Sequence, residues 1–210
     1  MMDFRKSSSL GVAITESGSF RGYPVPYLNI DNQKNITIPG VFSKAIPLYL
    51  EEGGQVLLDH DNRVESVVAT AMDAGEDVRG FWVDSLFSGS EKAQEVRKRA
   101  SEGSIRKMSA LFYGKAKFYN EKQIHGLWNN YGFQPNARQL ELAKRGADVI
   151  TSVDRISEVS IVAVPANPEA NIVAVKSFDG EIETSLTVAP RIDLAALARR
   201  ANLADKLLGR

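Results

Sequence analysis

The segment DVITSVDRISEVSIVAV, residues 148–164, carries the strongest β-strand pattern in the chain. Eight of its seventeen residues are valine or isoleucine, whose branched side chains pack well on a pleated sheet and are less suited to a helix. No glycine or proline interrupts the segment before Pro165. It predicts either one long strand or two strands that meet at Asp154-Arg155.

Shorter β-prone stretches surround this segment and outnumber the helical ones. The expected strands are residues 20–30, 36–38, 55–58, 64–72, 80–87, 104–118 and 172–175, and the expected helices are residues 41–50, 88–102, 136–145 and 191–208. Residues 73–77 are expected to form a turn, and residues 119–133 a long irregular stretch. Because strands and helices do not alternate regularly, the sequence predicts an α+β protein whose mainly antiparallel β-barrel or sandwich is flanked by a few helices.

The helix expected over residues 88–102 has the clearest boundaries. Ser88 and Glu91 fit the Ser-x-x-Glu capping box, and Gly103 stands where the glycine after a helix belongs. Acidic and basic residues interleave along its polar face, which is typical of a surface helix rather than of one that binds nucleic acid.

The chain divides into a body, residues 10–176, and a tail, residues 177–210. Residues 177–190 are polar and are expected to form a linker. Residues 191–208 are expected to form an amphipathic helix, with Leu194, Leu197 and Ala201 on one stripe. Three roles are open for this helix. It would anchor the protein to a partner, be trimmed off, or pack as a plain tail on the barrel or on a second subunit.

Composition excludes several classes of function. The 210 residues include 26 Lys+Arg and 26 Asp+Glu, and a nucleic-acid binder normally carries a basic excess. The absence of cysteine excludes disulfides, thiolate metal sites and a cysteine nucleophile. With two histidines, a metal site built on several imidazoles is not expected. The sequence contains no run of about 18 apolar residues, so no membrane span is expected. It also lacks an apolar segment near the N-terminus, so no secretory signal is expected.

A serine nucleophile needs a base, and the chain offers two histidines for that task. His60 directly follows the apolar stretch 56–58, which would hold its backbone rigidly, whereas His125 lies in a polar stretch. Taken alone, His60 fits a hydrogen-bonded surface residue as well as a base. A metal site at residues 59–61 is disfavoured because successive strand side chains diverge. Ser109 lies within an expected strand, where it fits a small packing residue as well as a nucleophile.

Several segments in order resemble one known family. They are Asp31, then IPGVF at 38–42, LLDHD at 57–61, GSIRKMS at 103–109 and EVSIVAVPANP at 158–168 with Ala170. Together they resemble the prohead (procapsid) maturation proteases of tailed bacteriophages, the HK97-type serine proteases. The resemblance covers about residues 10–176. It implies an assemblin-like fold, a β-barrel flanked by helices.

The resemblance also implies site residues. Ser109 matches the family's nucleophile and His60 its base, and Glu158 matches the acidic residue of the closing motif. Asp59 and Asp61 compete with Glu158 for the third role because they flank His60. The sequence departs from the family beside Ser109, where Ala110-Leu111 replaces a pattern that often includes glycine, so the local oxyanion geometry is left open. No cofactor and no metal are implied.

The function implied is that of a serine endopeptidase of phage capsid maturation. Its partners would be the major capsid protein with its scaffolding segment, and a second copy of itself in autoprocessing. It would act in the host cytoplasm, inside the procapsid, without nucleic acid or membrane as a partner. The alternative is a noncatalytic barrel that serves as a capsid scaffold or assembly component.

Overall fold

The computed structural model describes residues 18–176 and 182–185, in which strands predominate. The strands are β1 (Ser19–Pro26), β2 (Asn35–Thr37), β3 (Gln55–Leu58), β4 (Val67–Glu76), β5 (Gly80–Phe87), β6 (Lys107–Tyr119), β7 (Ala147–Val162), β8 (Asn171–Lys176) and β9 (Ile182–Ser185). The helices are α1 (Ala45–Glu51), α2 (Glu91–Ser101), α3 (Glu121–Tyr131) and α4 (Ala137–Ala143), with a 3₁₀ turn at Val64–Ser66.

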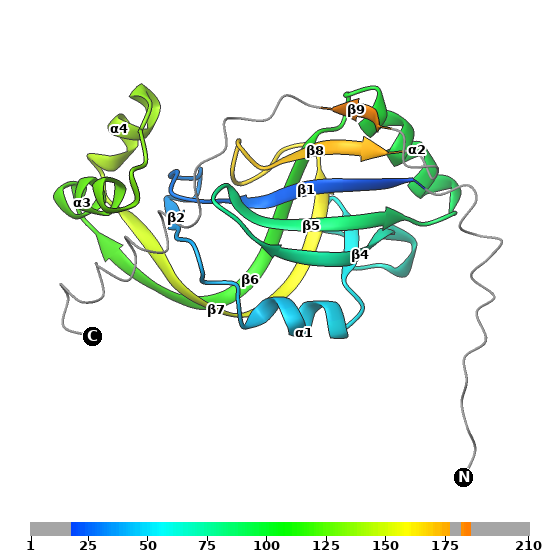
Figure 1. Cartoon of the computed structure of the whole chain (residues 1–210), viewed down its shortest axis with the longest axis horizontal. Helices are drawn as coiled ribbons and strands as arrows, with labels where there is room; N and C mark the ends of the chain where they lie inside the picture. Colours follow the sequence, from blue (N-terminus) through cyan, green and yellow to red (C-terminus); the bar gives the residue numbers. More distant parts are fainter. Residues whose placement is uncertain (1–17, 177–181, 186–210) are drawn as a thin grey trace, which may run out of the picture.

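Seven of the described strands close into a barrel (Figure 1). They are hydrogen-bonded in the order β1-β5-β4-β3-β7-β6-β8, and β8 pairs with β1 to complete the circle. β2 and β9 add to the outside of this path. The pairs β3–β7 and β2–β7 are parallel, and the other described pairs are antiparallel. The predicted α+β fold with a mainly antiparallel barrel is therefore confirmed.

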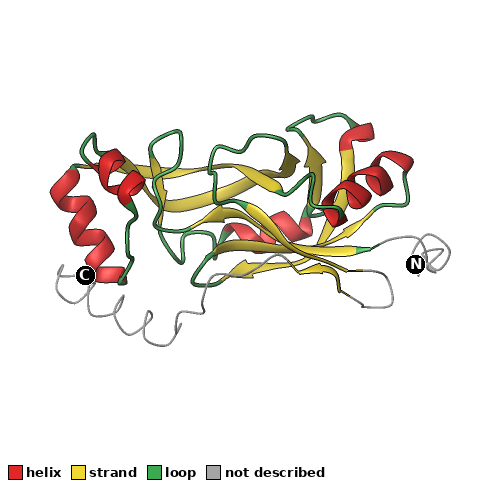
Figure 2. Ribbon diagram, turned by 90° about the horizontal axis from the view of Figure 1, so that it is seen from above, coloured by secondary structure: helices red, strands yellow, loops and turns green. Residues whose placement is uncertain are grey.

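β6 and β7 are the longest strands and form the frame of the molecule. They pair from Lys107↔Val162 to Tyr119↔Ala147, with three irregularities in the register. The valine-rich segment is thus one continuous strand, and no break occurs at Asp154-Arg155. The two strands run beyond the barrel and carry α3 and α4 at their far end, whereas α2 lies at the opposite end of the molecule (Figures 1 and 2).

Apolar side chains fill the barrel interior, and in β5 they alternate with more exposed residues along the strand. Phe42 is fully buried. Its ring stacks on Phe81 with centroids 4.8 Å apart and meets the edge of Phe112 at 5.2 Å. The Pro39-Gly40 turn delivers Phe42 to this position, since Gly40 adopts a φ of 89° that L side chains rarely tolerate. The predicted turn therefore positions Phe42 in the core of the barrel.

Two predicted irregular segments are regular in the structure. Residues 73–76 continue β4 rather than turning, because they pair with β5 as far as Glu76↔Phe81. Residues 121–131 form α3, which begins with a capping box between Asn120 and Gln123. Trp128 of α3 is buried, and its indole N–H donates to the Leu28 carbonyl at 2.6 Å.

The boundaries of two other segments also differ from the prediction. Ser90 rather than Ser88 caps α2, by accepting the Ala93 N–H at 3.2 Å. Within the predicted linker, residues 182–185 form β9, which pairs with β8. The predicted helix 191–208 and the first residues of the predicted body lie outside the described residues, so the domain boundaries stay a prediction.

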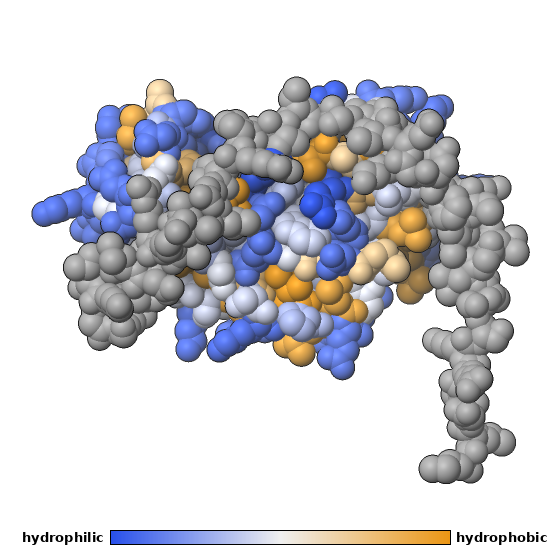
Figure 3. Space-filling view, in the orientation of Figure 1, coloured by the Kyte–Doolittle hydropathy of each residue, from blue (hydrophilic) through white to orange (hydrophobic). Residues whose placement is uncertain are grey.

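On the face shown in Figure 3, blue and orange areas are interleaved, and the largest orange area lies along the lower edge, where Figure 1 places α1. No helix in the described part of the chain is long and apolar enough to cross a membrane.

Candidate active site

The candidate site lies on the outer face of the barrel, where β3, β7 and β6 run side by side. Val159 and Met108 point into the core, so their sequence neighbours Glu158, Ser160 and Ser109 point to the other face. Ser109 lies directly opposite Ser160 in the β6–β7 register. These three polar residues are nevertheless only 5%, 0% and 6% exposed, respectively, which is unusual for the outside of a barrel.

His60 reaches this face through a tight turn at the end of β3. β3 runs parallel to β7, with Leu58 paired to Ile161. Asp59 and His60 then adopt φ values of 52° and 60°, in the left-handed region that residues other than glycine rarely enter. The turn directs the ring back over β7, where Nδ1 of His60 donates to Oε1 of Glu158. Ser160 Oγ donates to the same carboxylate oxygen at 3.3 Å.

The two aspartates beside His60 hold the turn instead of the ring. Asp59 accepts the Ala163 N–H at 3.1 Å. Asp61 accepts hydrogen bonds from Arg63 and, at 2.6 Å, from the Ser66 hydroxyl. These bonds from Arg63 and Ser66 keep the pKa of Asp61 well below its usual range. The contact to His60 thus comes from Glu158 and from neither rival.

Ser109, His60 and Glu158 line one open pocket of about 540 Å³, here termed the site pocket. Its remaining wall includes Asn62 and residues 164–166, which follow β7. Among the described residues, no hydrogen bond joins Ser109 Oγ to the His60 ring. Such bonds between a nucleophile and its base are often long before substrate binds.

Two further hollows adjoin the site pocket and extend it into a groove. One has about 400 Å³ and shares Asn62 and Glu158 with the site pocket. Arg155 and Glu52, which form an exposed ion pair at 3.1 Å, also line it. The other has about 60 Å³ and shares Ser109, Ala110 and Ala166 with the site pocket. The nucleophile candidate therefore lies part-way along a groove rather than at its end.

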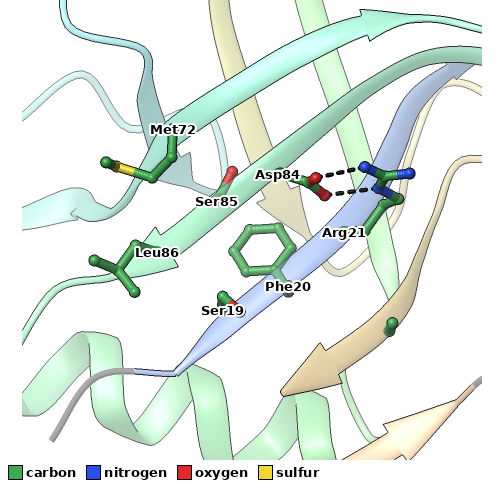
Figure 4. Close-up of a pocket in the computed structure, with 8 residues that line it drawn as sticks. Ser19, Phe20, Arg21, Met72, Asp84, Ser85 and Leu86 are labelled. Atoms are coloured by element: carbon green, nitrogen blue, oxygen red, sulfur yellow. Dashed lines mark hydrogen bonds and ion pairs between the residues drawn. The ribbon is translucent and has the colours of Figure 1, made fainter. Parts of the chain in front are cut away.

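A separate hollow on the outer surface of β1 and β5 shares no lining residue with the site pocket (Figure 4). There the Arg21 guanidinium binds both carboxylate oxygens of Asp84, at 2.7 and 2.5 Å, and lies over the Trp82 ring. Because the two charges neutralise each other, this ion pair stabilises the β1–β5 pairing.

Other residues considered from the sequence lie elsewhere. His125 is on α3, where its ring meets Trp128 with centroids 5.5 Å apart. Ser104 donates to the Arg99 carbonyl just after α2. In the described part of the chain, no group of three or more histidine, aspartate or glutamate side chains is placed to hold a metal ion.

Ser160 belongs to the closing EVS motif, but the contact that it makes in the site was not predicted from the sequence. Its hydroxyl donates to Glu158, and its backbone lies opposite Ser109 in the β6–β7 register. The signal for it was the Glu-x-Ser spacing, because residues two apart on a strand share a face.

The sequence was also compared with known proteins. The model of the caudovirus prohead serine protease family matches residues 5–183. The chain belongs to this family. The family predicted from the motifs is thereby confirmed.

One relative within the caudovirus prohead serine proteases is the prohead protease of Enterobacteria phage HK97, which is 26% identical over 171 residues. The match covers 80% of this chain and 64% of the HK97 protein, so the chain spans less than two thirds of that relative.

Two solved structures are similar to this chain. The capsid assembly protease of bacteriophage T4 has a TM-score of 0.47 at 11% identity, covering 70% of this chain and 82% of that one. The varicella-zoster virus protease has a TM-score of 0.39 at 15% identity, covering 90% of this chain and 77% of that one.

Proposed function

We propose that this chain is a serine endopeptidase of phage capsid maturation, with Ser109 as nucleophile, His60 as base and Glu158 as the third catalytic residue. The observation that carries the proposal is the His60–Glu158 contact in the same pocket as Ser109. Glu158 accepts a hydrogen bond from Nδ1–H, which leaves Nε2 of the neutral ring as the acceptor that a serine hydroxyl requires.

The reaction then follows from the placement of these groups. Ser109 Oγ attacks the scissile carbonyl carbon while its proton passes to Nε2 of His60. The C–N bond breaks as His60 returns the proton to the leaving amine, and the carboxylate of Glu158 stabilises the imidazolium in between. In the second half, His60 takes a proton from water as the water oxygen attacks the acyl ester. His60 then returns that proton to Ser109 Oγ as the ester C–O bond breaks, which releases the acid product.

An extended peptide fits this groove. β6 pairs with β7 along one edge, while along its other edge the described residues pair with it only at Lys107↔Asn171. From Ser109 onward, that free edge can hydrogen-bond a substrate strand, a common way for a protein to hold an extended peptide. The substrate would thus be an exposed flexible segment rather than a folded domain.

The substrates we propose are the scaffolding segment of the major capsid protein and a second copy of the protease. The relative from phage HK97 is named a prohead protease, and the similar T4 protein a capsid assembly protease. The phage-encoded enzyme would act inside the procapsid, in the host cytoplasm.

Co-expression with the capsid protein of the same phage tests the proposal. The wild-type chain should shorten the capsid protein on a gel, and Ser109→Ala should leave it at full length. Assembly of particles without any cleavage by the wild-type chain would favour the alternative, a noncatalytic scaffold or assembly component.

A further inference from the structure

The smallest hollow of the groove, termed the Asp31 hollow, lies beside Ser109 and does not include His60. Its apolar wall comes from Pro24, Val25 and Phe112, and its polar end from the segment between β1 and β2. Among the described residues that line it, Asp31 alone is charged. A charged group beside a nucleophile, behind an apolar wall, is the arrangement expected of a pocket that selects one side chain.

One carboxylate oxygen of Asp31 can accept a further hydrogen bond. Its Oδ1 accepts the backbone N–H groups of Gln33 and Asn35, both at 2.8 Å. Its Oδ2 has only a long contact of 3.5 Å to the Asn35 side chain. No cation pairs with this carboxylate among the described residues, and partial burial raises the pKa of Asp31. Partial burial of a carboxylate without a counter-ion carries a desolvation cost, and a cationic ligand would offset part of that cost.

The amides nearby do not supply the missing charge. Asn29 and Asn167 bind each other through two amide hydrogen bonds, at 2.7 and 3.0 Å. They form a neutral wall whose hydrogen-bonding groups are already engaged. Among the described residues that line the hollow, the carboxylate of Asp31 is therefore the group that can recognise a charged side chain.

The direction of the substrate follows from the position of the base. His60 must deliver its proton to the leaving amine, so the amine side of the substrate lies over His60. The acyl side runs past Ser109 in the other direction, toward the Asp31 hollow. The side chain that enters this hollow is then the one on the acyl side of the scissile bond.

We infer that the Asp31 hollow selects a lysine-like side chain immediately on the acyl side of the cleaved bond. The hollow is small, at about 60 Å³, so a methylene chain would fill it more readily than a bulky aromatic ring. The methylenes would pack on the apolar wall and the ammonium group would bind Oδ2 of Asp31. This inference rests on the proposed function, because it takes Ser109 as the nucleophile.

Peptidyl phosphonates that differ only in the acyl-side residue test the inference on the full chain. Lysine and norleucine have similar shapes, but norleucine lacks the ammonium group, and a glutamate reagent carries the opposite charge. The rate at which each reagent modifies Ser109 is followed by intact mass. We expect lysine to react at least about tenfold faster than norleucine, the effect of one charge-assisted hydrogen bond, and glutamate to react slowest.

Asp31→Asn is the matched variant. The asparagine keeps Oδ1 as acceptor for the two backbone N–H groups, so the turn is retained while the charge is lost. The lysine rate should fall to the norleucine rate, and the norleucine rate should stay unchanged. Equal lysine and norleucine rates in the wild-type chain would overturn the inference, even if the variant fails to fold. So would a lysine preference that survives in a folded Asp31→Asn.

Different results would contradict the proposed function and the inferred selectivity of the Asp31 hollow. If a small fluorophosphonate without any side chain also leaves Ser109 unmodified, the proposed function is wrong, and so is the lysine selectivity that rests on it. If that reagent modifies Ser109 but the lysine reagent reacts no faster than the norleucine reagent, only the inferred selectivity of the Asp31 hollow is wrong.

Discussion

His60 and Glu158 are in direct contact although 98 residues separate them in the chain. The parallel pairing of β3 with β7 produces this contact, because it places the end of β3 beside Ile161. The left-handed turn at residues 59–60 then folds the ring back by the short distance to Glu158. The geometry of the site is thus fixed by two buried strands rather than by a mobile loop.

Replacement of Ser109 by alanine should abolish cleavage and leave the fold intact. The change removes one hydroxyl from a nearly buried position, so the thermal midpoint should move little. Loss of a catalytic nucleophile lowers the rate by about 10⁴-fold or more. Capsid cleavage on a gel and thermal unfolding followed by circular dichroism give the two measurements.

Ser104→Ala is the matched control for this experiment. Ser104 is exposed and bonds only a helix-end carbonyl, so its loss should leave cleavage unchanged. If the Ser109→Ala variant still cleaves, the nucleophile must be another serine. Ser160 would be the next candidate, because it lies opposite Ser109 in the β6–β7 pair.

The two histidines should behave differently. His60→Ala should be as inactive as Ser109→Ala, and the double variant no slower than either, because members of one catalytic unit are not additive. His125→Ala should keep its activity, since His125 packs against Trp128 on α3. Cleavage rates of the four variants decide the matter. An inactive but folded His125→Ala beside an active His60→Ala would contradict the assignment of the base.

Glu158→Gln should lower the cleavage rate strongly without unfolding the protein. An amide can donate to the ring and hold it in the wrong tautomer, which costs about 10⁴-fold in a well-studied triad. Asp61→Asn is the comparison, because Asp61 pairs with exposed Arg63, accepts the Ser66 hydroxyl and makes no hydrogen bond with the His60 ring among the described residues. An exposed pair is worth about 0–1 kcal/mol, so the rate should change little. Similar losses in both variants would mean that the turn, and not the carboxylate at Glu158, sets the rate.

Ser160 should act as a positioning residue for Glu158. Ser160→Ala removes one hydrogen bond to the carboxylate, and a net loss of about 0.5–1.5 kcal/mol corresponds to a rate roughly 2- to 10-fold lower. Ser160→Thr keeps the hydroxyl and should recover most of that rate. If threonine and alanine are equally slow at unchanged thermal midpoints, the hydroxyl has no positioning role.

Stability should depend on Phe42 far more than on the site residues. Phe42 is fully buried between Phe81 and Phe112, and removal of a buried phenylalanine costs about 3–5 kcal/mol of unfolding free energy. Urea unfolding of Phe42→Ala measures the loss. A loss below about 1 kcal/mol would mean that this ring does not close the barrel interior.

Periodicity in the sequence predicted the elements whose side chains alternate clearly. The valine-rich segment predicted β7, and the barrel class followed from the number of strands. Periodicity could not predict α3, because its polar and aromatic residues hide a helix whose buried face is Ile124 and Trp128. Nor could it predict the parallel β3–β7 pair, which depends on contacts between distant segments.

The candidate site could be predicted from the motifs only in part. They supplied Ser109, His60 and Glu158 as candidates but left Asp59 and Asp61 as rivals for the third place. The choice depends on where the chain turns after Leu58, and two consecutive residues with positive φ are not visible in a sequence. The contact between Ser160 and Glu158 was not predicted either, although the Glu-x-Ser spacing places both side chains on one face of β7.

Mass analysis of the chain after reaction with a small fluorophosphonate tests the proposed catalytic unit most directly. We predict one covalent adduct, mapped to Ser109 by peptide sequencing, that is absent from Ser109→Ala and strongly slowed in His60→Ala and Glu158→Gln. An adduct on another serine, or a Ser109 adduct that forms equally fast without His60, would contradict the proposal that Ser109, His60 and Glu158 work as one unit.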